Sequence, residues 1–164
     1  MTKNERQRKV LKIILIVLVI LTLAFIWTNS LLSRQESNDQ SEKVKDFLTE
    51  VFTLGGKTQL TRIFNYIIDN IRKIAHFVEF AFLGGLLVIC FGTEKNTSHL
   101  RAFLFSLGLS IAVAILDEML QILSKRGSAV SDVILDASGA AFGALLITLI
   151  SLIFGFLKRR PICA

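Results

Sequence analysis

Long apolar stretches alternate with short polar ones along this chain. A hydrocarbon core about 30 Å thick requires roughly 20 apolar residues in a helix. The sequence therefore predicts membrane-spanning helices at residues 10–27, 74–91, 100–123 and 133–157. Trp27 closes the first of these stretches, as an interfacial aromatic residue does. The predicted fold is an all-α, polytopic bundle of four transmembrane helices.

The segment between the first two predicted spans has a different pattern. Apolar residues recur there at helical spacing among charges: Val44, Phe47, Leu48, Val51 and Phe52. This spacing predicts a short amphipathic helix. The expected organisation is a cytoplasmic N-terminus with the first helix (1–27), an extracytoplasmic amphipathic linker (28–73), a three-helix core (74–157) and a basic cytoplasmic tail (158–164).

Composition supports a membrane protein, since 52% of the residues are apolar and the mean hydropathy is +0.60. The formal charge of +6 does not indicate nucleic acid. The basic residues gather at the ends of apolar stretches, without the stacking aromatics of a nucleic-acid groove. The two cysteines, Cys90 and Cys163, lack the spacing of a disulfide framework or a zinc site.

Basic residues at both ends of the chain predict its orientation, because short cytoplasmic flanks carry an excess of Lys and Arg. The first predicted span follows Lys3, Arg6, Arg8, Lys9 and Lys12, and the last one precedes Lys158, Arg159 and Arg160. We expect a multi-pass protein with both termini in the cytoplasm. An even number of crossings agrees with this.

Ionisable side chains inside a span are costly and are functional candidates by default. His76 and Glu79 lie three residues apart near the start of the second span, on one helical face. Asp117, Glu118 and Gln121 lie near the end of the third span. Each cluster also has a structural interpretation, as a buried hydrogen-bonded pair or as solvated residues at the interface.

A third cluster leads into the fourth span, where Arg126 and Ser128 precede Asp132 and Asp136. Asp132 could simply cap that helix. Because chain direction reverses at every crossing, all three clusters are expected at one membrane surface, the extracytoplasmic one. The candidate catalytic residues are His76, Glu79, Asp117 and Glu118. The candidate ligand-binding residues are Arg72, Lys73, Gln121, Arg126, Ser128, Asp132 and Asp136.

Small residues predict close helix packing, with Gly139 and Gly143 in a small-xxx-small arrangement. The neighbouring spans carry Gly84, Gly85, Ser106, Gly108 and Ser110. The clusters could then make contacts across helices. Such a carboxylate-rich site with one imidazole could hold a divalent cation, perform acid/base chemistry, or bind a cationic or phosphate head group. The spacing does not choose among them.

Three sequence blocks occur in a fixed order: RK-x-x-HF-x-E at residues 72–79, DE-x-x-Q at 117–121, and R-x-x-x-x-x-D-x-x-x-D at 126–136. Together they resemble the VanZ-like family over about residues 70–150. This resemblance implies a small membrane protein of the bacterial cell envelope, of Gram-positive origin, in a family named for a teicoplanin-resistance protein. The chain departs from it at Phe80, where many relatives carry Tyr, and at Ser124-Lys125, which replaces Pro-Gly.

We expect a protein of the bacterial cytoplasmic membrane whose extracytoplasmic pocket recognises a lipid-linked or glycopeptide-related ligand, with a link to teicoplanin resistance. The alternative is an intramembrane enzyme acting on lipid phosphate or polyprenyl-linked substrates, for which a divalent cation would be a suitable cofactor. A transporter is the third hypothesis; with four spans and no inverted repeat, it would have to function as a dimer. The expected partners are the bilayer, that ligand and a second copy of the chain; nucleic acid is not expected.

Overall fold

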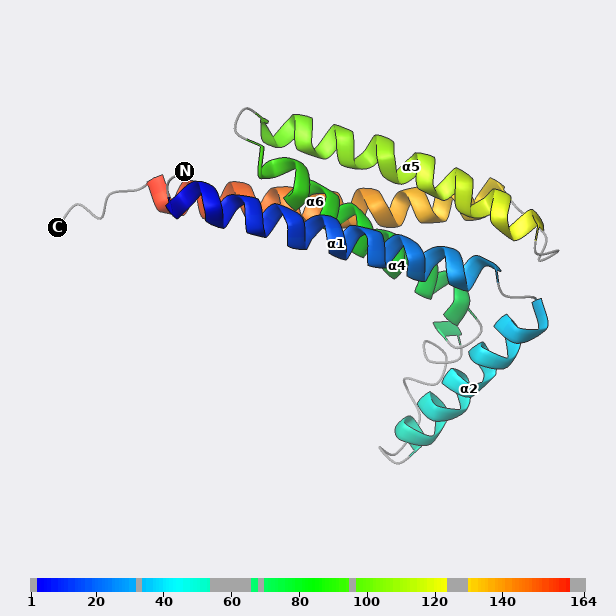
Figure 1. Ribbon diagram of the computed structural model, residues 1–164. Coiled ribbons are helices and arrows are strands. Elements are labelled where there is room, and N and C mark those ends of the chain that lie inside the picture. Colours follow the sequence, from blue (N-terminus) through cyan, green and yellow to red (C-terminus); the bar gives the residue numbers. More distant parts are fainter. Residues whose placement is uncertain are drawn as a thin grey trace.

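The computed structural model describes residues 3–31, 34–53, 66–67, 70–94, 97–123 and 130–159. Its long helices are α1 (Lys3–Leu31), α2 (Arg34–Thr53), α4 (Ile71–Gly92), α5 (His99–Leu123) and α6 (Val130–Arg159) (Figure 1). Within these described residues, four segments are long and apolar enough to cross a membrane: Glu5–Leu31, Ile71–Gly92, His99–Leu123 and Val130–Phe154. The prediction of an all-α, four-helix membrane bundle is confirmed.

Helix α4 is the centre of the bundle. It packs most extensively on α6, and it also contacts α5 and α1. Helix α1 completes the bundle by packing on α4 and α5, whereas α2 makes few contacts and projects away from one end (Figure 1). The amphipathic helix expected in the linker is thus present, with Val44 and Phe47 exposed.

The two ends of the bundle differ in their residues. At one end Lys12 of α1 forms an exposed ion pair with Glu94, which follows α4. Chain direction then places the end of α1, the start of α4, the end of α5 and the start of α6 at the opposite end (Figure 1). That opposite end carries the polar clusters.

The bundle buries a narrow apolar core and exposes most of its apolar surface. The core contains Ile26, Phe80, Leu83, Val113 and Ala140. Large apolar side chains cover the outer faces of all four long bundle helices. A water-soluble monomer does not expose apolar surface on this scale, so these faces fit contact with lipid.

Glycines allow α4 and α6 to approach closely. A Cβ atom at Gly139 would overlap the carbonyl oxygen of Phe77, and one at Gly143 would overlap that of Ala81. The interface is therefore backbone against backbone, as predicted for the small-xxx-small arrangement. Gly108 differs from the expectation, because a Cβ there would meet only open space.

Candidate functional site

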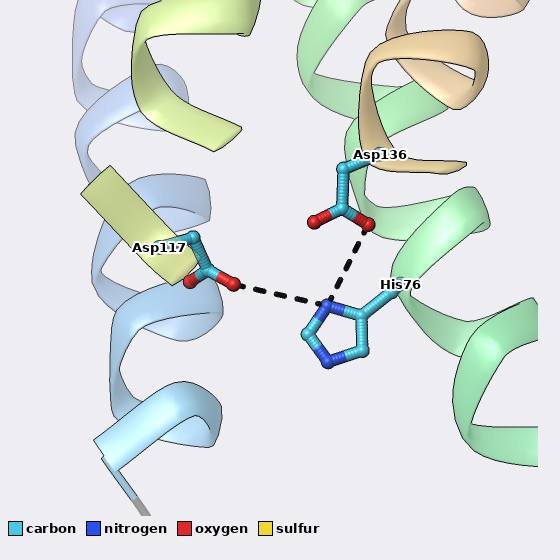
Figure 2. A group of neighbouring side chains, drawn as sticks. All are labelled: His76, Asp117 and Asp136. Carbon is cyan, nitrogen blue, oxygen red and sulfur yellow. Dashed lines mark ion pairs between the residues drawn. The ribbon is translucent and has the colours of Figure 1, made fainter. Parts of the chain in front are cut away.

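The polar end of the bundle contains three ionisable side chains that point toward one another (Figure 2). His76 of α4 places Nδ1 3.9 Å from Oδ1 of Asp136 on α6 and 4.0 Å from Oδ2 of Asp117 on α5. The side chains of His76, Asp117 and Asp136 are 12%, 0% and 3% exposed. We call these three residues the triad.

The close α4–α6 contact explains how the triad forms. Phe77, whose carbonyl lies against Gly139, directly follows His76 in the chain. Gly139 lies three residues after Asp136, which is about one helical turn. The absence of a side chain at Gly139 therefore brings His76 and Asp136 within reach of each other.

The last turn of α1 donates hydrogen bonds to two acids of the site. Ser30 donates a hydrogen bond of 2.6 Å to Oδ1 of Asp117. Asn29 donates one of 3.1 Å to Oε1 of Glu79. Within α5, Gln121 donates to Oδ2 of Asp117 over 2.9 Å. These donors fix the orientation of both carboxylates.

Asn29 and Ser30 are site residues that the sequence reasoning did not identify. They follow Trp27, the predicted end of the first span, whereas α1 continues to Leu31. A signal was present in the sequence. Two polar residues at the end of the first span must lie at the same membrane surface as the start of the second.

The site concentrates negative charge. Four other carboxyl groups act electrostatically on Asp136: those of Glu79, Asp117, Glu118 and Asp132. Carboxylates this close in a low-dielectric site cannot all remain ionised unless a cation lies nearby; otherwise at least one of them takes up a proton. At 3.9 and 4.0 Å the His76 contacts are too long to be hydrogen bonds. The separations between Nδ1 of His76 and the two carboxylate oxygens therefore leave room for an ion between the imidazole and each acid.

A cavity of about 330 Å³ lies beside the triad. It is lined by Ser41, Lys45, Asn70, Ile71, Arg72, Lys73, His76, Gln121, Asp132, Leu135 and Asp136. Ser41 and Lys45 belong to α2, so the linker helix also contributes to the site; the sequence reasoning had not assigned them. Basic residues and acids thus share one cavity.

The structure places the candidate residues in different positions. His76 and Asp136 belong to both the triad and the cavity, while Arg72, Lys73, Gln121 and Asp132 line the cavity. Glu118 is buried, and Glu79 bonds to α1. Arg126 and Ser128 lie outside the described residues. Phe80 belongs to the apolar core and does not line the cavity.

Two kinds of chemistry fit this arrangement. An imidazole oriented between carboxylates can give or take a proton. The same three side chains each offer one donor atom to a common point, which fits a metal ion. The basic residues at the cavity add the ability to bind an anion.

Comparison with known protein families places most of the chain in one family. The model of the VanZ/LLP1 family matches residues 14–152. This is longer than the stretch of about residues 70–150 on which the resemblance rested, and it includes most of α1. No curated protein and no solved structure matches the chain.

Proposed function

This chain belongs to the VanZ/LLP1 family, and from that premise we propose that its polar cavity binds the head group of a lipid-linked ligand at the extracytoplasmic membrane surface. The observation that carries the proposal is a cavity with basic and acidic walls at one end of an apolar bundle. The positive flanks of both termini support the extracytoplasmic side. A ligand that belongs to the cell envelope would be compatible with a role in teicoplanin resistance.

The size of the cavity favours a head group over a whole glycopeptide. Its volume of about 330 Å³ lies at the small end of ligand pockets, which run from roughly 300 to 1,000 Å³. A phosphate with one attached sugar suits that space. A glycopeptide could insert only one of its groups.

The charges of the cavity favour a phosphate. Lys45, Arg72 and Lys73 supply cationic donors, which bind phosphate through charge-assisted hydrogen bonds. Asp132 and Asp136 can accept hydrogen bonds from hydroxyl or amino groups. Ile71 and Leu135 give the cavity an apolar wall, which suits the first carbons of a lipid chain.

The test is lipid binding to the full chain in nanodiscs. We expect labelled polyprenyl phosphate to bind and the uncharged polyprenol to bind roughly 10- to 100-fold more weakly, since a hydrogen bond to a charged group contributes roughly 1.5–3 kcal/mol. Replacing both Arg72 and Lys73 with Gln should remove this difference. Arg101→Gln, an exposed arginine at the opposite end of the bundle, is the matched control.

Two results would contradict the proposal: equal binding of the two lipids, or equal effects of the double variant and of Arg101→Gln. Teicoplanin serves as a competitor in the same assay. Displacement of the lipid by the drug would identify a glycopeptide-related ligand, while binding of the lipid without displacement would identify the lipid alone.

Enzymatic action on a lipid phosphate is the second candidate, and the triad favours it. His76 would act as acid or base, with the negative charge of Asp117 stabilising its protonated form and Arg72 holding the phosphate. Glu79 and Glu118 remain further candidates for proton transfer. Release of phosphate from labelled polyprenyl phosphate, lost in His76→Ala, would support this reading. Tight binding without turnover would rule it out.

A further inference from the structure

The triad has a geometry that the binding of a head group alone does not explain. We propose that a divalent first-row transition-metal ion, with Zn²⁺ as the best match, binds between Nδ1 of His76, Oδ2 of Asp117 and Oδ1 of Asp136. One ligand atom from each of the three residues lies within 4.8 Å of those of the other two. The inference deepens the proposed function and rests on it only for the identity of the molecule that completes the coordination.

The distances within the triad suit an ion better than direct contacts. The two Nδ1–oxygen separations, 3.9 and 4.0 Å, exceed hydrogen-bond length. Ligand atoms about 2.1 Å from one zinc ion are about 3.4 Å apart at a tetrahedral angle. A shift of several tenths of an ångström in the side chains would complete the site.

Asp136 supplies an independent observation. Its side chain is only 3% exposed, and Oδ1 accepts no hydrogen bond from the part of the chain that the structure describes. This oxygen points toward Nδ1 of His76 (Figure 2). A buried carboxylate oxygen without a donor is unfavourable, and a bound cation would satisfy it.

Asp117 is already oriented as a ligand would be. Ser30 occupies Oδ1, and Gln121 donates to Oδ2. A carboxylate oxygen has two lone pairs, so Oδ2 retains one for an ion. Hydrogen-bonded partners of this kind fix the ligands of metal sites and raise their affinity.

The donor set selects the type of ion. Ca²⁺ and Mg²⁺ prefer oxygen ligands, whereas imidazole suits zinc and its neighbours in the first transition row. Three protein ligands leave one position of a tetrahedral zinc site open. His76 and Asp136 also line the cavity, so a phosphate oxygen of the head group could fill that position.

Metal binding can be measured on the full-length, tag-free protein without any lipid. We expect one Zn²⁺ per chain by competition with a chromophoric chelator, and a Co²⁺ complex with d–d absorption bands. Asp136→Asn and His76→Gln should each weaken binding by about 100-fold or more, the upper end of the loss seen when only a supporting residue is removed. Asp136→His should keep binding, because imidazole replaces the lost ligand.

His99→Gln is the matched control, because His99 is the other of the two histidines and is exposed at the opposite end of α5. Asp132→Asn tests whether negative charge alone is enough, and we expect a much smaller loss of affinity than in Asp136→Asn, because Asp132 supplies no ligand atom. No ion in the wild type, or equal losses in His76→Gln and His99→Gln, would overturn the inference.

The same samples separate the two proposals. Lipid binding that persists in a chelator, with no ion bound in its absence, would overturn the metal site and leave the proposed function standing. An ion bound with the expected dependence on His76 and Asp136, without lipid binding, would support the metal site and contradict the proposed function. Circular dichroism of each variant confirms that it is folded.

Discussion

Replacing Gly139 with alanine should weaken the bundle and open the triad at once. A Cβ at this position would overlap the carbonyl oxygen of Phe77 and lie 3.1 Å from its carbonyl carbon and Cα. These atoms belong to the backbone of α4, so no side-chain rotation can relieve the overlap. Helices α4 and α6 must move apart, and His76 and Asp136 move apart with them.

The expected magnitude follows from two opposing effects. Alanine stabilises a helix interior by about 1 kcal/mol relative to glycine, while overpacking of a close contact costs about 1–3 kcal/mol. We expect a net loss of about 1–2 kcal/mol for Gly139→Ala, since the clash is with backbone. Gly143→Ala should lose as much or more, because its Cβ would also lie within 2.6 Å of the carbonyl carbon of Ala81.

Gly108→Ala is the matched control, since a Cβ there meets only open space. It should stabilise the protein by roughly 0.5–1 kcal/mol through helix propensity alone. Unfolding of the purified protein in a denaturing detergent measures all three variants, and Zn²⁺ or lipid affinity measures the effect on the site. Equal stabilities of Gly139→Ala and Gly108→Ala would show that the backbone contact at Gly139 does not limit the approach of α4 and α6.

Three further substitutions test individual contacts. Ser30→Ala removes a donor to the buried carboxylate of Asp117 and should cost about 1.5–3 kcal/mol of unfolding free energy; an unchanged unfolding midpoint would show that the bond contributes nothing. Ser106→Ala, which removes a buried hydroxyl bonded to a carbonyl of α4, should cost about 1 kcal/mol in the same assay, and a gain in stability would contradict this. Lys12→Gln should change stability little, because its partner Glu94 and Lys12 itself are both exposed. A large loss that persists in high salt would indicate a desolvated pair.

The sequence was sufficient to predict the membrane spans, because hydropathy measures the apolar character that a segment needs to lie in the bilayer. The four observed helices contain the predicted stretches, yet they extend beyond them. Helix α1 begins at Lys3 and runs past Trp27 to Leu31. An aromatic residue marks the membrane interface, but backbone hydrogen bonds continue a helix beyond it, and hydropathy does not detect that continuation.

The candidate site was predictable as far as chain direction determines it. Alternating crossings place His76, Asp117 and Asp136 at one end, and the structure brings these three together. The contact of Asn29 depends on which face of α1 meets α4, and that of Ser30 on which face of α1 meets α5. The rotation of α1 about its own axis decides which of its faces meets each neighbour. Packing across several helices sets this rotation, so residue spacing within one helix could not reveal it.

For the same reason, the sequence could not predict that α2 lies close to the site. Ser41 and Lys45 reach the cavity because α2 leaves α1 at a particular angle. Apolar periodicity predicted that a helix would form there, but it contains no information on direction. Val44 and Phe47 of the amphipathic pattern are exposed in this helix.

The most direct test of the account is labelling of single cysteines in intact cells with a membrane-impermeant maleimide. Cys90 and Cys163 are first replaced, and cysteine is introduced one at a time at Lys73, Asp132, Glu94 and Arg101. We predict labelling from outside at Lys73 and Asp132, and labelling of Glu94 and Arg101 only after permeabilisation. Labelling of Lys73 and Asp132 from opposite sides would mean that the two walls of the cavity do not share a membrane surface, and the account would be wrong.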